Sequence, residues 1–499
     1  MIAIARPEKT KENIMSIRES LEPLELLDLN KCDSVGSLVN AMSRCSFGAR
    51  MLGEVAHTLF DWIREENRPV IIYDGGINTP LYSVLSLMVQ HKWFSDVMLP
   101  EKHRYAMGMT GRNALIIGSY SSRHEDSICS KAKRSIFINE FGMAPKGTTK
   151  DGYFPDAIFA DPSFVMPVLY HTLQEKMGVK KTSVAELMAV LPPFGGLALE
   201  VSEGAQTLHS MVTDPTCDLF MTISGAMTIA KMSLLICEMI DRGMVQYISS
   251  TGALMAHGLI ESIGLKHYKY NPAHDDTLLA SERLNRVTDT LEPEENFTHI
   301  AEILNSILDG IDEKAPLSSW ILHQKIGKFL HENYPHERGI LKSAYEKNVP
   351  IVVPAFIDSE MGNDVYVHNR DRERKRRSPL VMNMELDSKK LFEMAITAKR
   401  IGIFSIGGGV PRNNTQNVSP LIDIYNERLG SSLLPKKFVH GCRIAPDKPY
   451  YGHLSGCTYN ENKSWRKMET AGIFSEIHGD ATQIWPFVLK YVIEKIENK

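Results

Sequence analysis

The chain has 499 residues, of which 43% are hydrophobic and 23% charged, and its formal net charge is −4. This length predicts two or three domains, and the composition excludes long disordered tracts. Because the balanced charge provides no broad basic surface, we expect no nucleic-acid partner.

The N-terminal residues and the cysteines bear on the compartment. Residues 1–7 are followed by charged residues and lack the apolar stretch of a signal peptide, and no window approaches the ~18 apolar residues of a membrane span. Seven scattered cysteines without a C-x-x-C pair are typical of reduced thiols, and they indicate neither a disulfide frame nor a zinc site. We therefore expect a cytoplasmic protein with no membrane segment and no bound metal.

Short apolar runs that end in small residues recur along the chain, and each precedes a longer segment with helical spacing. Residues 227–243 have such spacing and end in a glycine, so they predict the helix of a β-α-β unit. The alternation predicts a Rossmann-like α/β fold, with a mostly parallel sheet flanked by helices. The runs that we expect to be strands are 70–73, 219–222, 246–248, 351–355 and 401–406.

Two later segments depart from this alternation. Residues 262–345 carry no comparable strand run, and 299–308 and 320–330 have amphipathic spacing, so we expect a helical insertion. Residues 370–377 are all charged, which favours a solvated loop. A site for an acidic partner or a nucleotide phosphate is the alternative interpretation of this loop.

A weak internal repeat relates the two ends of the chain. The segment 161–167, running on to Glu175, parallels 480–486, running on to Glu494, with the same internal spacing. Residues 46–49 likewise resemble 193–196. Either the N-terminal part is a degenerate partial repeat, or β-α-β units merely look alike. We predict an N-terminal α/β unit over residues 1–182 and a second domain over residues 183–499.

Small-residue turns follow several predicted strands, and such turns let a helix N-terminus approach the phosphates of a dinucleotide. None has G-x-G-x-x-G spacing, so each alone is a weak indication. Their order is more informative. From about residue 191 onward the chain resembles the deoxyhypusine synthase family, including its bacterial deoxyhypusine-synthase-like branch. The segments that carry the resemblance are 223–227, 250–253, 284–290, 352–359, 407–410, 452–456, 461–467 and 480–481.

The resemblance implies an NAD-dependent enzyme that oxidises a polyamine to an imine, takes up its aminobutyl part on a lysine and passes it to an acceptor amine. It assigns this lysine to Lys467, with Trp465 and Glu461 beside it. A single lysine is usually a solvated charge, but a partly desolvated one loses its proton more easily and suits imine formation. The face of Trp465 could hold an alkyl amine.

The resemblance also assigns a cofactor site along the turns. Aspartates after strands can accept hydrogen bonds from ribose hydroxyls, although their commoner role is to cap a helix or a turn. The cofactor-binding residues that the resemblance implies are Ser224, Ser250, Thr251, Gly252, Asp358, Gly408, Gly409, Asp480 and Ala481.

The predicted substrate pocket has lost acidic positions. A cationic polyamine needs carboxylates near its ammonium groups, because a buried ammonium without a partner is costly. Leu454 stands where eukaryotic family members have an aspartate, and other acidic or histidine positions are changed as well. Strict deoxyhypusine synthesis is therefore in question. The predicted substrate-binding residues are His257, Asn363, Asp364, Asn413 and His453.

Three functions remain open. The first is aminoalkyl transfer from a polyamine or related amine to a protein lysine or to a free diamine, which would give deoxyhypusine-like or homospermidine-like products. The second is an NAD-dependent amine or imine oxidoreductase, and the third is a catalytically decayed regulatory paralogue. The resemblance also implies a homo-oligomer, a tetramer or a dimer, with active sites between paired subunits. Whether the N-terminal unit occupies that pairing surface is left open.

Overall fold

The computed structural model describes residues 17–75, 78–98, 110–118, 131–140, 142, 144, 150 and 152–498. The N-terminal residues 1–7, Gly76 of the first predicted turn, and Cys129 lie outside this part. The other six cysteines are free thiols. Within the described residues, no helix combines the length and the apolar character that a membrane span requires.

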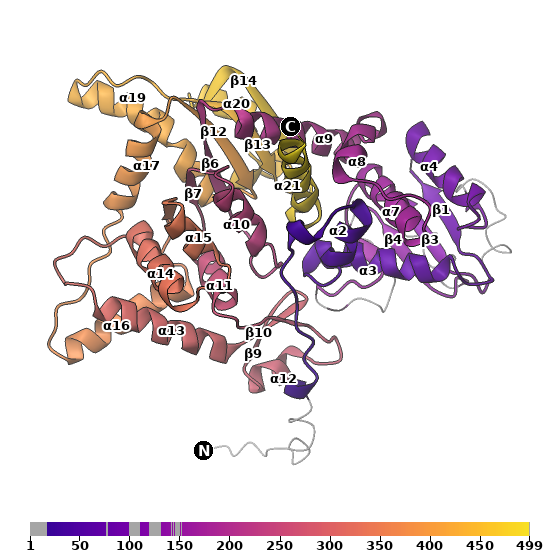
Figure 1. Ribbon diagram of the computed structural model, residues 1–499, viewed down its shortest axis with the longest axis horizontal. Coiled ribbons are helices and arrows are strands. Elements are labelled where there is room, and N and C mark those ends of the chain that lie inside the picture. Colours follow the sequence, from indigo (N-terminus) through magenta and orange to yellow (C-terminus); the bar gives the residue numbers. More distant parts are fainter. Residues whose placement is uncertain are drawn as a thin grey trace, which may run out of the picture.

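A parallel sheet of six strands forms the centre of the C-terminal part, in the order β11-β7-β6-β12-β13-β14 (Figure 1). All neighbouring strands are parallel. Its helices include α9 and α21 on one face and α17 and α19 on the other. The strands are β6 (Cys217–Ile223), β7 (Tyr247–Ser249), β11 (Ile351–Val352), β12 (Arg400–Ile406), β13 (Phe438–Ile444) and β14 (Met468–Ile477).

Both faces of this sheet are buried, because successive side chains of a strand point to opposite faces. On β6, Met221 packs into the cluster that holds Trp485 of α21, whereas Phe220 packs with Ile422 of α19. The helices of this part of the chain, outside the insertion, are α9 (Gly196–Thr213), α10 (Ser233–Asp241), α11 (Gly252–Ser262), α16 (Glu360–Arg374), α17 (Glu385–Thr397), α18 (Val410–Gln416), α19 (Val418–Leu429), α20 (Tyr459–Ser464) and α21 (Ala481–Glu497).

The prediction of a mostly parallel α/β fold is confirmed, and each predicted strand run contains a strand, although only Ile351 and Val352 of the run 351–355 are in one. The helix expected from residue 227 begins later, at Ser233. The reason is local: Lys231 has a φ of 72°, in the left-handed region that a continuing right-handed helix excludes.

A second parallel sheet lies in the N-terminal part, to the right in Figure 1, with the order β2-β1-β3-β4-β5. Its strands are β1 (Val70–Asp74), β2 (Val97–Met98), β3 (Ala114–Gly118), β4 (Ser135–Ile138) and β5 (Ala157–Ile158). The helices around it are α2 (Val35–Met42), α3 (Phe47–Trp62), α4 (Thr79–Gln90) and α7 (Pro162–Lys176), and α8 (Val184–Val190) leads into the C-terminal part.

The insertion is not purely helical, which corrects the expectation for residues 262–345. It contains the antiparallel sheet β8-β10-β9, whose strands have only two to four residues and so show no long apolar run. The bounds are β8 (Tyr268–Lys269), α12 (Asp276–Ser281), β9 (Leu284–Val287), β10 (Thr290–Pro293), α13 (Glu294–Asp309), α14 (Ser319–Asn333) and α15 (Ile340–Glu346).

The arginine-rich stretch is also not the loop that its charge suggested. Residues 370–374 form the last turn of α16, where Arg370 pairs with Glu373 and Asp371 pairs with Lys375. Opposite charges three and four residues apart stabilise a helix. Arg372 points inward and is only 2% exposed.

The two parts of the chain meet through two equivalent contacts. Asp161, the N-cap of α7, accepts a hydrogen bond from the backbone N–H of Leu197 (3.0 Å), and the Ser163 hydroxyl accepts one from Ala198 (3.3 Å), at the start of α9. In the reverse direction, Thr482 at the start of α21 accepts one from Ala49 (3.1 Å) in α3. The last helix of each part therefore caps the first long helix of the other, as in a two-fold pair.

These contacts also correct the register of the repeat. Ala49 and Ala198 make the same bond to Thr482 and Ser163 respectively. Residues 46–49 therefore correspond to 195–198, two residues beyond the segment 193–196 with which the sequence comparison aligned them. Phe47 and Phe194, which the predicted register paired, therefore do not occupy equivalent positions.

Candidate functional site

The predicted turns share one edge of the large sheet. Since all its strands are parallel, their carboxyl ends lie on the same side, and Ser224, Ser250, Gly407 and Asp480 follow β6, β7, β12 and β14 there. This is the edge at which open α/β sheets generally bind ligands. Lys467 precedes β14 and reaches its cavity along the face of the sheet, between α18 and α20.

A cavity of about 340 Å³ surrounds Lys467. The lysine side chain is 6% exposed, and its Nζ donates a hydrogen bond to Asn413 Oδ1 at 2.9 Å. The same Nζ lies 5.7 Å from the centre of the Trp465 ring. The residues that line the cavity are Gly409, Arg412, Asn413, Gln416, Asn417, Leu454, Cys457, Glu461, Asn462, Trp465 and Lys467.

The environment of Lys467 favours its neutral amine. Burial lowers the pKa of Lys467, and the positive charge of Arg412 lowers it further. A lysine with a lowered pKa carries more free amine near neutral pH, which is the form that attacks a carbonyl carbon. The site thus holds a lysine amine with a lowered pKa beside an aromatic face.

Few carboxylates accompany this amine. Among the described residues that line the cavity, Glu461 is the only one with a carboxylate, and it is exposed in the first turn of α20. Leu454 lies in the lining as well, 46% exposed, at the position where an aspartate was expected. Sequence reasoning missed Arg412 and Gln416, which share the helix of Asn413 at helical spacing.

The triple-glycine turn connects this cavity to Ser224. The Ser224 hydroxyl accepts a hydrogen bond from the N–H of Gly408 at 2.9 Å. A side chain on Gly408 would bring a Cβ within 2.4 Å of Ser455 Cα, so this position requires glycine. Gly409 has a φ of 70° and begins α18, and it lines the lysine cavity. The structure thus brings three predicted cofactor residues beside the lysine site.

A second group of predicted cofactor residues lies where β7 passes into α11. The Ser250 side chain is buried, and its hydroxyl has no hydrogen-bond partner. Thr251 is the N-cap of α11 but makes no side-chain capping bond, and a Cβ on Gly252 would lie 2.3 Å from Ser359 Cβ. Asp358 is exposed immediately before Ser359. Unsatisfied buried groups of this kind point to a bound ligand or ordered water.

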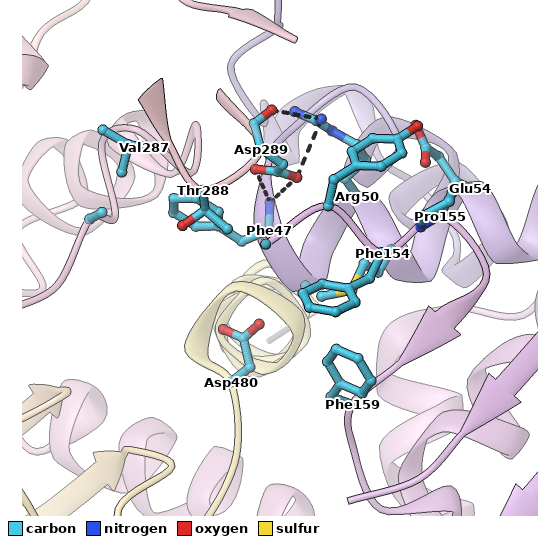
Figure 2. Close-up of a pocket in the computed structure, with 15 residues that line it drawn as sticks. Phe47, Arg50, Glu54, Phe154, Pro155, Phe159, Val287, Thr288, Asp289 and Asp480 are labelled. Atoms are coloured by element: carbon cyan, nitrogen blue, oxygen red, sulfur yellow. Dashed lines mark hydrogen bonds and ion pairs between the residues drawn. The ribbon is translucent and has the colours of Figure 1, made fainter. Parts of the chain in front are cut away.

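Asp480 lies in a different cavity, also about 340 Å³, between the two parts of the chain (Figure 2). Figure 2 shows its carboxylate at the start of α21, below the Arg50–Asp289 ion pair, whose closest atoms are 3.3 Å apart. Burial raises the pKa of Asp480, while hydrogen bonds from Thr482 lower it. The neighbouring Ala481 is buried as the first residue of α21.

The structure therefore does not join every predicted cofactor residue into one cavity. Asp480 and Lys467 line separate cavities. The N-terminal part contributes Phe47 and Arg50 to the cavity of Asp480, and sequence reasoning missed both residues. No local motif marks them, because their position depends on the packing of α3 against the insertion.

His257 belongs to a buried network and lies apart from the described lining of the lysine cavity. Its Nδ1 is 2.7 Å from Glu292 Oε2, and His267 Nε2 is 2.6 Å from the same oxygen. His267 also lies 2.8 Å from Lys231 Nζ, which pairs with Glu261 at 2.5 Å. His257, His267 and Glu292 are metal-ligand types within 4.8 Å of one another, but the Lys231 ammonium beside them disfavours a cation.

The remaining predicted substrate residues lie on other surfaces. Asn363 is exposed on α16, and its neighbour Asp364 is partly buried. Burial and the nearby charge of Glu360 raise the pKa of Asp364 to about 6. His453 is exposed and pairs with Asp447 at 3.0 Å. Of the five predicted substrate residues, the structure places Asn413 in contact with Lys467.

Comparison with known proteins agrees with this architecture. The family model for deoxyhypusine synthase matches residues 186–492. "Probable deoxyhypusine synthase 1" of Archaeoglobus fulgidus is 28% identical over 62% of this chain and 94% of its own length. "Probable deoxyhypusine synthase 2" of Methanosarcina acetivorans is 30% identical over 64% and 88%. The "deoxyhypusine synthase-like protein" of Elusimicrobium minutum is 27% identical over 65% and 84%.

Proposed function

The chain belongs to the deoxyhypusine synthase family, and from this membership we propose that it is an NAD-dependent transferase of aminoalkyl groups. The donor is a polyamine or a related amine, and the acceptor is a protein lysine or a free diamine. The observation that carries the proposal is Lys467, whose amine is buried, oriented by Asn413 and shifted toward its neutral form.

Each part of the lysine site has a role in this chemistry. Lys467 attacks the carbon of the oxidised donor and forms an imine as the leaving group departs. Asn413 Oδ1 directs the amine, and the Trp465 face packs on the alkyl chain of the donor. Glu461, the carboxylate in the lining, accepts the proton that the lysine loses.

NAD is the proposed cofactor, and when bound it supplies hydride uptake from the donor carbon and hydride return at the end. The unpartnered Ser250 hydroxyl and the close approach of backbone at Gly252 and Gly408 fit a dinucleotide. Asp358 is exposed on the neighbouring turn, where its carboxylate can accept hydrogen bonds from ribose hydroxyls. The part that Asp480 and Ala481 play in cofactor binding stays a prediction.

We further propose that residues 1–182 are a partial repeat that takes the place of a second subunit. The reciprocal contacts of Ser163 with Ala198 and of Thr482 with Ala49 support this, because a two-fold pair makes the same contact twice. If so, the assembly contains fewer chains than the family's usual tetramer. Light scattering coupled to gel filtration should show a dimer or a monomer, and a tetramer would contradict the proposal.

The buried free thiols fit a reducing compartment, and we propose that the protein acts in the cytoplasm. An NAD-dependent amine or imine oxidoreductase is the second candidate function. Leu454 favours it, because an apolar residue now lies where a polyamine would need a carboxylate. A decayed regulatory paralogue would have no chemical need for the Lys467–Asn413 contact.

A product assay separates these functions. Purified protein is incubated with NAD, spermidine and either putrescine or a candidate protein acceptor, and products are identified by mass spectrometry. Transfer predicts an aminobutylated acceptor, which is lost in Lys467→Ala and retained in Lys463→Ala. NADH formation without a transferred group would support the oxidoreductase. NAD binding without any turnover would support the decayed paralogue.

A further inference from the structure

The cavity around Lys467 has an unusual charge balance for a site that binds a polycation. It contains two basic side chains, Lys467 and Arg412, while Glu461 at its exposed side is the only carboxylate among its described lining residues. Other polar lining residues are amides, such as Asn413 and Gln416. An ammonium group placed here would meet more repulsion than attraction.

Arg412 is the main source of this balance. It is 2% exposed, and its Nη2 donates to the Cys457 carbonyl at 2.7 Å. Its neighbour Arg443 has Glu476 at 3.1 Å, but no described carboxylate lies within ion-pair distance of Arg412. Its guanidinium lies over the Tyr459 ring, 5.2 Å from the centroid, and its Nε has no hydrogen-bond partner among the described residues. A buried guanidinium is stable when an anion pairs with it, so this one is poised for an anionic ligand.

Gln416 supplies a second unsatisfied donor on the same helix. It is 2% exposed and lines the cavity, and its Nε2 has no hydrogen-bond partner in the part of the chain that the structure describes. Positions 412 and 416 are four residues apart in α18, so their side chains lie on one face of that helix. Two buried donors beside one another suit the two oxygens of a carboxylate.

We propose that the group transferred through Lys467 carries a carboxylate, bound by Arg412 and Gln416, so that the donor is an amino-acid-like amine. This inference rests on the proposed imine chemistry of Lys467 and names its substrate class. The imine forms when neutral Nζ adds to an aldehyde carbon, after which the nitrogen loses its protons and the carbonyl oxygen leaves as water. In the test, cyanoborohydride supplies the hydride that reduces the imine to a secondary amine.

Three aldehydes of equal chain length test the charge preference without NAD. They are succinic semialdehyde, which is anionic, butanal, which is neutral, and 4-trimethylammoniobutanal, which is cationic. The full-length protein is reacted with each and cyanoborohydride, and labelling at Lys467 is measured by mass spectrometry. We expect succinic semialdehyde to reach half-labelling at a concentration about tenfold below that of the cationic aldehyde.

Variants separate the carboxylate site from general effects. Arg412→Gln should remove the preference for the anionic aldehyde, while Arg412→Lys should keep part of it and the exposed Arg428→Gln should leave it unchanged. If Arg412→Gln does not fold, Gln416→Ala should still weaken the preference. Equal or better labelling by the cationic aldehyde overturns this inference and leaves the imine chemistry intact. Failure of all three to label Lys467 overturns the imine chemistry and, with it, the inference.

Discussion

Replacing Glu292 by glutamine should destabilise the protein by about 3 kcal/mol at neutral pH. Glu292 is 1% exposed and accepts hydrogen bonds from His257, His267 and Asn296. Burial alone would raise its pKa, but the two histidines outweigh burial and lower the pKa from 4.5 to about 2. A shift of this size corresponds to roughly 3 kcal/mol of folding free energy.

The sign of the pH dependence follows from the lowered pKa. A carboxyl group with a depressed folded-state pKa stabilises the fold above its unfolded value of 4.5, and this contribution is lost as pH falls toward about 2. Burial lowers the pKa of His267, but its hydrogen bonds to Glu261 and Glu292 outweigh burial and raise it. In urea denaturation, the destabilisation by Glu292→Gln should therefore be larger at pH 5.5 than at pH 8, because the variant also loses the stabilisation of protonated His267. The difference should shrink below pH 4.5.

A matched control is available three residues along the chain. Glu295 is exposed and pairs with Arg18 at the surface, so Glu295→Gln should change the free energy of unfolding by less than about 0.5 kcal/mol. A Glu292→Gln variant as stable as this control at pH 7 would refute the reasoning. It would mean that the histidine contacts do not stabilise the buried carboxylate.

Three further changes have defined outcomes. Gly48→Ala places a Cβ 1.9 Å from Asp480 Oδ2. It should lower the free energy of unfolding, measured by urea denaturation, by about 1–3 kcal/mol. An unchanged midpoint would argue against this close contact between the two parts of the chain. Asp364→Asn should raise the free energy of unfolding at pH 7.5 but not at pH 3.5. The reason is that the pKa of Asp364, about 6 in the folded protein, makes its ionised form destabilising there. Equal effects at both pH values would contradict this. Arg412→Gln should move the pH profile of Lys467 labelling to higher pH, because it removes a positive charge that lowers the pKa of Lys467. An unshifted profile would show that burial alone lowers the pKa of Lys467.

The large sheet was predicted correctly, and Lys467 was proposed as the reactive lysine, because both have local signals. Apolar runs before small-residue turns marked β6, β7 and β12, and the family motif marked Lys467. It did not identify the three-stranded sheet of the insertion, because β8 to β10 are too short for an alternating pattern to stand out. The helix end over residues 370–374 was missed because its ion pairs appear only once the segment is helical.

The residues that line the lysine cavity could not be predicted from local patterns. Arg412 and Gln416 line the cavity because one face of α18 lies toward Lys467. The spacing of residues in the sequence does not indicate which face of this helix that is. The assignment of Asp480 to the cofactor site relied on motif order, and the structure places it in a cavity shared with α3. Contacts between distant parts of a chain depend on packing, which local patterns do not encode.

The central claim is that Lys467 forms the imine, and peptide mapping of a reduced adduct tests it most directly. The protein is incubated with NAD and an amine donor, treated with borohydride and digested, and the modified residue is identified by tandem mass spectrometry. We expect one adduct, on Lys467, which disappears in Lys467→Ala and persists in Lys463→Ala. An adduct on another lysine that persists in Lys467→Ala would contradict it.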